Sequence, residues 1–134
     1  MMSTPTSVRF SSGISGADYP IVVGLNLEKD LVEAVAHAGA GRRVAVISDD
    51  VVRQKWGESV VSALAGAGLA VELFTFPHGE KNKNQATVSA LQDELLKKRY
   101  GRDTLIIALG GGVVGDVAGY VAATYLRGVP YIQV

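Results

Sequence analysis

Three consecutive glycines followed by a lone carboxylate form the most chemically suggestive stretch of the sequence. Gly110, Gly111 and Gly112 follow the apolar run 105–109, and Asp116 lies in the apolar segment beyond them. Glycines at the start of a helix allow a ligand to approach the unpaired backbone N–H groups, which favour an anion such as a diphosphate. We therefore expect a buried strand, an anion-binding glycine turn, and a helix with Asp116 in its first turn.

The spacing of these glycines matches a dinucleotide-binding pattern only in part. Gly110, Gly112 and Gly115 satisfy G-x-G-x-x-G directly after a predicted strand. The full pattern needs an acidic residue about twenty positions later, where this chain has the uncharged run 131–134. A P-loop needs a lysine after the last glycine, where this chain has Asp116, which would repel a phosphate. Close packing of the helix on the strand is the alternative to ligand binding, and both stay open.

A second polar loop, HGEKNKN at residues 78–84, carries Glu80, Lys81 and Lys83. It separates a predicted strand from a predicted helix, so free helix N–H groups favour an anion here too. A lysine cluster at the carboxyl end of one strand, facing a glycine loop at the end of a neighbouring strand, predicts a diphosphate cradle with a carboxylate beside it. The alternative is a solvated turn, which suits Lys81 taken alone.

Two adjacent carboxylates, Asp49 and Asp50, follow the β-branched run 43–48. They could accept hydrogen bonds from ribose hydroxyls or cap the following helix, and the sequence favours neither. His37 lies in an apolar helical run and is predicted to be structural. His78 lies in the second polar loop, but no carboxylate accompanies it at metal-ligand spacing, so we expect no metal site in this chain.

Apolar runs and amphipathic stretches alternate along the chain and must position these groups. Strands are expected at 43–48, 70–76, 105–109 and 130–134, with two further edge strands at 8–10 and 19–24. Helices are expected near 31–36, over 52–64, over 83–99 with Gly101 as the stop, and after the glycine turn. This alternation predicts an α/β, Rossmann-like fold in which helices cover both faces of a mostly parallel sheet. Ligands of such sheets lie outside the carboxyl ends of the strands.

Composition sets the remaining limits. The 134 residues contain 13 Lys and Arg against 13 Asp and Glu, so no net charge attracts nucleic acid or an anionic membrane. The segment 104–126 carries one internal charge, but its glycines interrupt it and neither half could span a bilayer. The polar N-terminus lacks a signal-peptide core, and cysteine is absent. We expect a single cytoplasmic domain.

Two stretches resemble the N-terminal domain of the 3-dehydroquinate synthase family: FPHGEKNKN, and DTLIIALGGGVVGDVAGYVAATYLRGVPYIQV. The resemblance is most specific from Phe76 to Val134. Related sugar-phosphate cyclases carry similar glycine loops. The glycerol and iron-dependent alcohol dehydrogenases share the architecture but usually place a serine after the glycines.

The resemblance implies an enzyme that uses NAD catalytically, with zinc or cobalt, to convert 3-deoxy-D-arabino-heptulosonate 7-phosphate to 3-dehydroquinate and phosphate. This is a step of the shikimate pathway, and the family enzyme is expected to be a homodimer. NAD transiently oxidises a ring hydroxyl, phosphate is eliminated, the carbonyl is reduced again, and the opened ring recloses as a carbocycle.

The resemblance also implies roles for individual residues. Asp49 and Asp50 correspond to residues near the adenosine ribose, and Glu80 and Lys83 to residues that contact the cofactor. The diphosphate loop matches Gly111, Gly112 and Val113, beside which Lys81 and Gly115 are further candidate cofactor contacts. Asp116 matches a carboxylate near the nicotinamide and the substrate. Arg127 matches an arginine that reaches the substrate phosphate across a subunit interface.

The family sequence continues into a helical domain that holds the metal through one glutamate and two histidines. The 134 residues of this chain do not include that domain. Residues 1–134 are therefore expected to be the N-terminal NAD-binding domain, without turnover of its own. The alternatives are a related sugar-phosphate cyclase, or a stand-alone nucleotide-binding or assembly module.

Overall fold

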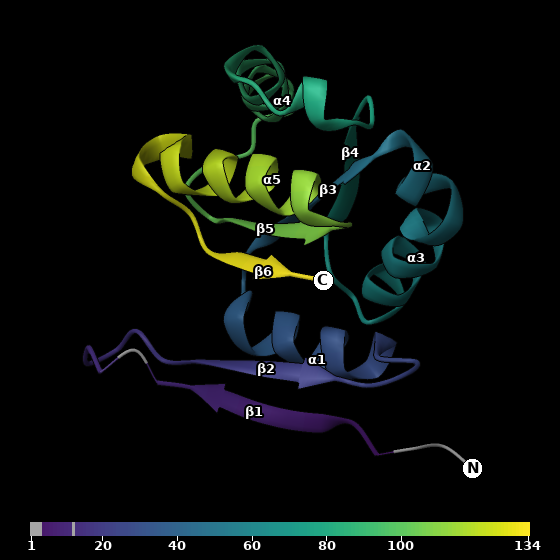
Figure 1. The fold of residues 1–134 in the computed structure, drawn as a ribbon, viewed down its shortest axis with the longest axis vertical. Coiled ribbons are helices and arrows are strands. Elements are labelled where there is room, and N and C mark those ends of the chain that lie inside the picture. The colour runs from purple at the N-terminus through teal and green to yellow at the C-terminus, as the bar shows by residue number, and fades with distance from the viewer. Residues whose placement is uncertain (1–3, 12) are drawn as a thin grey trace.

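Four parallel strands form the centre of the computed structural model, which describes residues 4–11 and 13–134. In chain order they are β3 (Arg43–Asp49), β4 (Val71–Phe76), β5 (Thr104–Leu109) and β6 (Tyr131–Gln133). Their order across the sheet is β4-β3-β5-β6, and every neighbouring pair is parallel (Figure 1). The expected parallel α/β sheet is confirmed.

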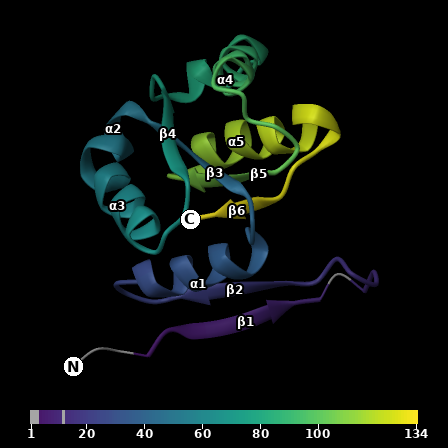
Figure 2. The ribbon, with the colours of Figure 1, turned by 180° about the vertical axis from the view of Figure 1, so that it is seen from behind.

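Helices cover both faces of this sheet, as Figures 1 and 2 show from opposite sides. The first face packs against α1 (Glu28–Ala38) and α3 (Glu58–Gly66), and the second against α4 (Gln85–Lys97) and α5 (Gly112–Thr124).

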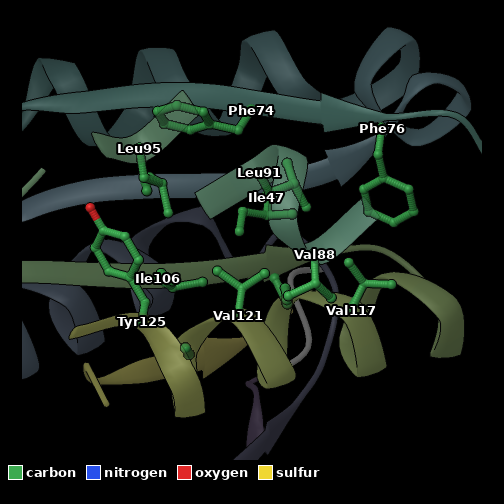
Figure 3. Close-up of a cluster of buried hydrophobic side chains, with 14 of the residues drawn as sticks. Ile47, Phe74, Phe76, Val88, Leu91, Leu95, Ile106, Val117, Val121 and Tyr125 are labelled. Carbon is green, nitrogen blue, oxygen red and sulfur yellow. The ribbon is translucent and has the colours of Figure 1, made fainter. Parts of the chain in front are cut away.

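Alternation along the strands produces two separate cores, because successive side chains of a strand point to opposite faces. Val44 and Val46 join the core with Leu64 of α3, whereas Ala45 and Ile47 join the other. Figure 3 shows part of that second core, where Ile47 lies among side chains of α4 and α5.

Short helical turns complete the connections between the main elements. From the end of β3 the chain continues through α2 (Asp50–Val52) and the π-helix η1 (Arg53–Gly57) directly into α3. Two 3-10 turns, η2 (Glu80–Asn82) and η3 (Tyr125–Arg127), precede α4 and follow α5. In the described part of the chain, no helix is long and apolar enough to cross a membrane.

The two N-terminal strands form as expected, but they are not edges of the main sheet. β1 (Thr6–Phe10) and β2 (Tyr19–Val23) pair with each other as a separate antiparallel sheet, in which Phe10 stacks on Tyr19 at 5.0 Å. Every residue of both strands is exposed. Their alternating pattern predicted strands correctly, but it could not say which partner they would choose.

The end of α4 also differs from the prediction. The helix stops at Lys97, and Arg99 rather than Gly101 takes the left-handed conformation that ends it (φ 59°). A cluster of side chains at the amino-terminal ends of the strands, here called the amino-edge cluster, accompanies this helix end. Arg43 donates to the carbonyls of Lys98 and Arg99 and lies 3.9 Å over the Tyr100 ring. These hydrogen bonds satisfy carbonyl groups at the C-terminus of α4, where a left-handed glycine is the usual way to end a helix.

Glu72 completes this amino-edge cluster. Its carboxylate accepts hydrogen bonds from Arg43, Lys98 and the Tyr100 hydroxyl. Burial, and next the negative charge of Glu72, raise the pKa of Tyr100 to about 12. The cluster joins the starts of β3 and β4 to the end of α4. It lies at the amino-terminal ends of the strands, whereas the polar loops lie at their carboxyl ends.

Candidate functional site

The helix start after β5 offers unpaired backbone N–H groups. Gly111 is the N-cap of α5 in an extended conformation, and no side chain caps the helix. The first helical hydrogen bond runs from the Gly115 N–H to the Gly111 carbonyl at 2.9 Å. The N–H groups ahead of it are of the kind that bind anions at helix N-termini.

The glycines of the turn and of the first part of α5 differ in the space around them. A Cβ on Gly110 would lie 2.7 Å from Val114, and one on Gly115 would lie 3.0 Å from the Gln133 amide, so these two permit close packing. A Cβ on Gly111 or Gly112 would meet nothing within 4 Å. Close packing is therefore shown for Gly110 and Gly115, whereas ligand binding at Gly111 and Gly112 stays a prediction that the open space permits. Gly115 is buried, and its expected contact with the cofactor stays a prediction.

Asp116 is not in the first turn of α5, which contains no acidic residue. The helix begins at Gly112, because Gly111 is still extended, and this places Asp116 at the start of the second turn. The helix dipole acts mainly within the first turn, so it is not the chief partner of this carboxylate. That partner is Lys83, whose Nζ lies 3.3 Å from Asp116 Oδ2.

Lys83 sits between two carboxylates. Its Nζ also lies 2.6 Å from Glu80 Oε1. The hydrogen bond to Glu80, followed by the one to Asp116, raises the pKa of Lys83 above its ordinary value. The ammonium is therefore charged at neutral pH and joins the polar loop before α4 to the side of α5.

The two loops do not lie at the ends of neighbouring strands, as the sequence analysis expected. β3 lies between β4 and β5. The loop after β4 nevertheless reaches α5, because α4 and α5 pack side by side on one face of the sheet (Figure 1). Lys81 is exposed on η2, and its carbonyl accepts a hydrogen bond from the Asn84 amide.

Asparagines fix the shape of this loop. The Asn82 amide donates to the His78 carbonyl at 2.7 Å, and the Asn84 side chain caps α4 by accepting from the Thr87 N–H at 3.0 Å. The predicted helix start near Lys83 therefore moves to Gln85, which leaves Lys83 free of the helix and able to reach Asp116.

The two aspartates after β3 take different partners. Asp49 is the cap of α2 and accepts from the N–H groups of Val51 and Val52 at 2.9 and 2.7 Å. Asp50 accepts from the backbone N–H of His78 at 2.9 Å and lies 2.8 Å from its ring Nδ1. The side-chain hydrogen bond to His78 holds the pKa of Asp50 below its ordinary value.

His78 does have a carboxylate partner, which the sequence did not predict. The missing signal was strand register: Asp49 pairs with Phe76 in the parallel ladder, so the residues just beyond both strands meet. Within the described residues, no group of three or more His, Cys, Asp or Glu side chains is placed to hold a metal ion.

A shallow groove of about 350 Å³ adjoins the Lys83–Asp116 pair. It is lined by residues from the start of α4 and the side of α5: Lys83, Asn84, Gln85, Val88, Asp116, Val117 and Tyr120. Arg127 does not join this groove. It follows the opposite end of α5, where Leu126 and Arg127 both have left-handed backbone angles (φ 48° and 71°).

Solved structures with this architecture define the class of protein. A 2-deoxy-scyllo-inosose synthase matches 98% of this chain and 35% of its own with a TM-score of 0.82 at 24% identity. The ValA 2-epi-5-epi-valiolone synthase from Streptomyces hygroscopicus, solved with NAD+ and Zn2+ bound, matches 92% of this chain and 34% of its own with a TM-score of 0.73 at 31% identity. The fold is that of the sugar-phosphate cyclases.

Sequence comparison gives the particular family. Residues 73–134 match the family described as 3-dehydroquinate synthase N-terminal. The 3-dehydroquinate synthase of Syntrophotalea carbinolica is 38% identical over 94% of this chain and 35% of its own length. That of Pelotomaculum thermopropionicum is 43% identical over 87% of this chain and 31% of its own. The chain belongs to the 3-dehydroquinate synthase family and spans about one third of the length of these relatives.

Proposed function

We propose that this chain is the NAD-binding lobe of a 3-dehydroquinate synthase, the enzyme that forms 3-dehydroquinate and phosphate from 3-deoxy-D-arabino-heptulosonate 7-phosphate. The observation that carries the proposal is the uncapped N-terminus of α5, where Gly111 and Gly112 leave open space beside the Lys83–Asp116 pair. The NAD+ bound in the ValA structure supports the choice of cofactor.

The residues present fit the cofactor. The diphosphate would lie against the free N–H groups of Gly112 and Val113, which a helix N-terminus makes favourable for an anion. Asp50, held by His78, would accept from the adenosine ribose, and Asp49 would order the same turn by capping α2. Glu80 and Lys83 would border the cofactor from the second loop. When bound, NAD supplies a hydride acceptor.

The chain's own groups in the lining of the groove would orient the substrate. Asp116 would accept a hydrogen bond from the hydroxyl to be oxidised. Lys83, charged and in contact with Asp116, would hold that carboxylate in place. A divalent metal does not fit the described residues, because no suitable ligand group occurs among them. The metal would have to be held outside these residues, and we propose that the chain alone performs no turnover.

We further propose that the whole enzyme is a cytoplasmic homodimer, in which Arg127 serves a partner subunit. It follows the end of α5 opposite to the glycine turn and does not line the groove of its own chain. We propose that it contacts the phosphate of a substrate bound to a partner subunit.

Titration of the chain with NAD in a calorimeter tests the proposal. Binding in the micromolar range or weaker is expected, because half of the contacts of a closed cleft are missing. The loss of translational and rotational freedom on binding is the same, so fewer contacts must offset it. The second arm measures phosphate release before and after addition of the remaining part of the Syntrophotalea carbinolica relative. Release only after addition supports a cofactor lobe, whereas NAD binding that never leads to release supports a stand-alone nucleotide-binding module.

A further inference from the structure

A buried hydroxyl connects β3 to the start of the glycine turn. Ser48 is fully buried at the end of β3, after four apolar residues, and it pairs with Leu109 in the parallel ladder. Its Oγ donates to the Leu109 carbonyl oxygen at 2.7 Å. A buried hydroxyl is unfavourable without a partner, so this bond explains why a serine is tolerated in an otherwise apolar strand.

The accepting carbonyl belongs to the peptide unit that leads into the turn. The N–H of the same unit, on Gly110, donates to the Val134 carbonyl at 3.2 Å. A peptide unit is planar, so the hydrogen bonds at its carbonyl and at its N–H fix one plane between them. Ser48 holds it from the β3 side and Val134 from the β6 side.

That peptide plane determines the direction in which α5 begins. Gly110 has a positive φ (153°) and packs against Val114, and the next residue, Gly111, is already the helix N-cap. A rotation of the plane before Gly110 would therefore turn the free N–H groups of the helix. No side-chain cap exists at α5 to compensate for such a rotation.

We propose that Ser48 is a positioning residue for diphosphate binding. It does not touch the ligand. Through the Leu109 carbonyl it holds the N–H groups at the start of α5 in the direction that a diphosphate requires. This inference rests on the proposed function, because it presupposes that NAD binds at this turn.

The test compares Ser48→Ala with Ser48→Thr, which keeps the hydroxyl and suits a strand. NAD and adenosine are titrated separately, because adenosine shares the nucleoside but lacks the diphosphate. Loss of one fixing hydrogen bond is expected to weaken NAD binding about five- to tenfold in Ser48→Ala. Adenosine binding should be unchanged, and Ser48→Thr should bind NAD like the wild type.

Wild-type NAD affinity in a folded Ser48→Ala variant overturns the role of Ser48 alone, and so does an equal loss of adenosine affinity, which would indicate a general effect on the fold. A wild-type chain that does not bind NAD overturns the proposed function, and this role with it. If Ser48→Ala does not fold, Ser48→Cys, which keeps the size but donates only weakly, takes its place in the same comparison.

Discussion

Lys83 and Asp116 form an ion pair of 3.3 Å between two segments that are 33 residues apart in the sequence. Both side chains are at least one third exposed, so the pair contributes little to stability. Its importance is positional: it places a permanent cation and a carboxylate together in the lining of the groove, about one helical turn from the uncapped start of α5.

Gly112→Val should abolish measurable NAD binding while leaving the fold intact. The valine side chain finds open space in the unliganded chain, but it occupies the approach to the free N–H groups. Calorimetry measures the affinity, and circular dichroism verifies the fold. Gly66→Val is the matched control, since Gly66 also faces open space, at the end of α3. Unchanged NAD affinity in folded Gly112→Val would contradict the proposed site.

Gly110→Ala should act on stability instead. Its Cβ would lie 2.7 Å from Val114, and the positive φ of Gly110 disfavours any side chain. Overpacking of this kind costs about 1–3 kcal/mol. Thermal unfolding should show a lower Tm than the wild type. An unchanged Tm would mean that α5 can shift away from the turn at no cost.

Asp50→Asn should flatten the acid limb of the stability curve. The folded-state pKa of Asp50 is below its ordinary value, so its contribution is present above about pH 4 and is lost as the pH falls through the folded pKa. Thermal melts between neutral and acidic pH should show a shallower decline in the variant. Asp18→Asn, on the connection between β1 and β2, is the comparison at a distant carboxylate. Equal slopes for Asp50→Asn and the wild type would show that the His78 contact is not maintained in solution.

Tyr100→Phe should change the alkaline limb. Because the pKa of Tyr100 is raised to about 12, its contribution is complete below about pH 10 and is lost as the pH rises toward 12. Spectroscopic titration of the tyrosines should therefore lose one late-titrating group in the variant. Tyr19→Phe removes an exposed tyrosine and provides the reference curve. A group that still titrates near pH 12 in Tyr100→Phe would contradict this assignment, whereas Tyr125 and Tyr131, whose pKa values burial also raises, should keep their late titrations.

Arg127→Gly should be more stable than Arg127→Ala by about 1 kcal/mol. Arg127 has a left-handed backbone (φ 71°), which costs energy for every residue except glycine. Both variants lose the guanidinium, so their difference in Tm reports the backbone alone. Equal Tm values would show that the turn relaxes when the arginine is removed. In the reconstituted enzyme both variants should be equally impaired, because the proposed function assigns the phosphate contact to the Arg127 side chain, which both variants lack.

The fold was predictable where periodicity and glycine placement act locally. The parallel sheet, the two covered faces and the helix after the glycine turn followed from alternation alone. The partner choice of β1 and β2 did not, because an alternating strand carries no information about which edge it meets. The end of α4 was mispredicted for a similar reason, since Arg43 is far from it in the sequence.

The sequence identified the residues of the candidate site better than it identified their contacts. The two loops and the isolated carboxylate were visible as letters, but the position of Asp116 in α5 depended on a single extended residue, Gly111. The partnership of Asp50 with His78 depended on strand register, and the anchoring of Leu109 by Ser48 on a contact across 61 residues. Each of these is a tertiary relationship that local patterns do not encode.

The central place of β3 has a consequence for how the chain assembles. Its contacts with β4 join residues 29 apart, as between Arg43 and Glu72, whereas those with β5 join residues 61 apart. Closing a loop twice as long costs about 0.6 kcal/mol more entropy, so we expect β3 and β4 to pair before β5 enters the sheet. The uncapped helix start acquires a fixed direction only at that late step. A molecule that binds at the start of α5 would consequently distinguish fully folded chains from chains in which β5 has not yet paired with β3.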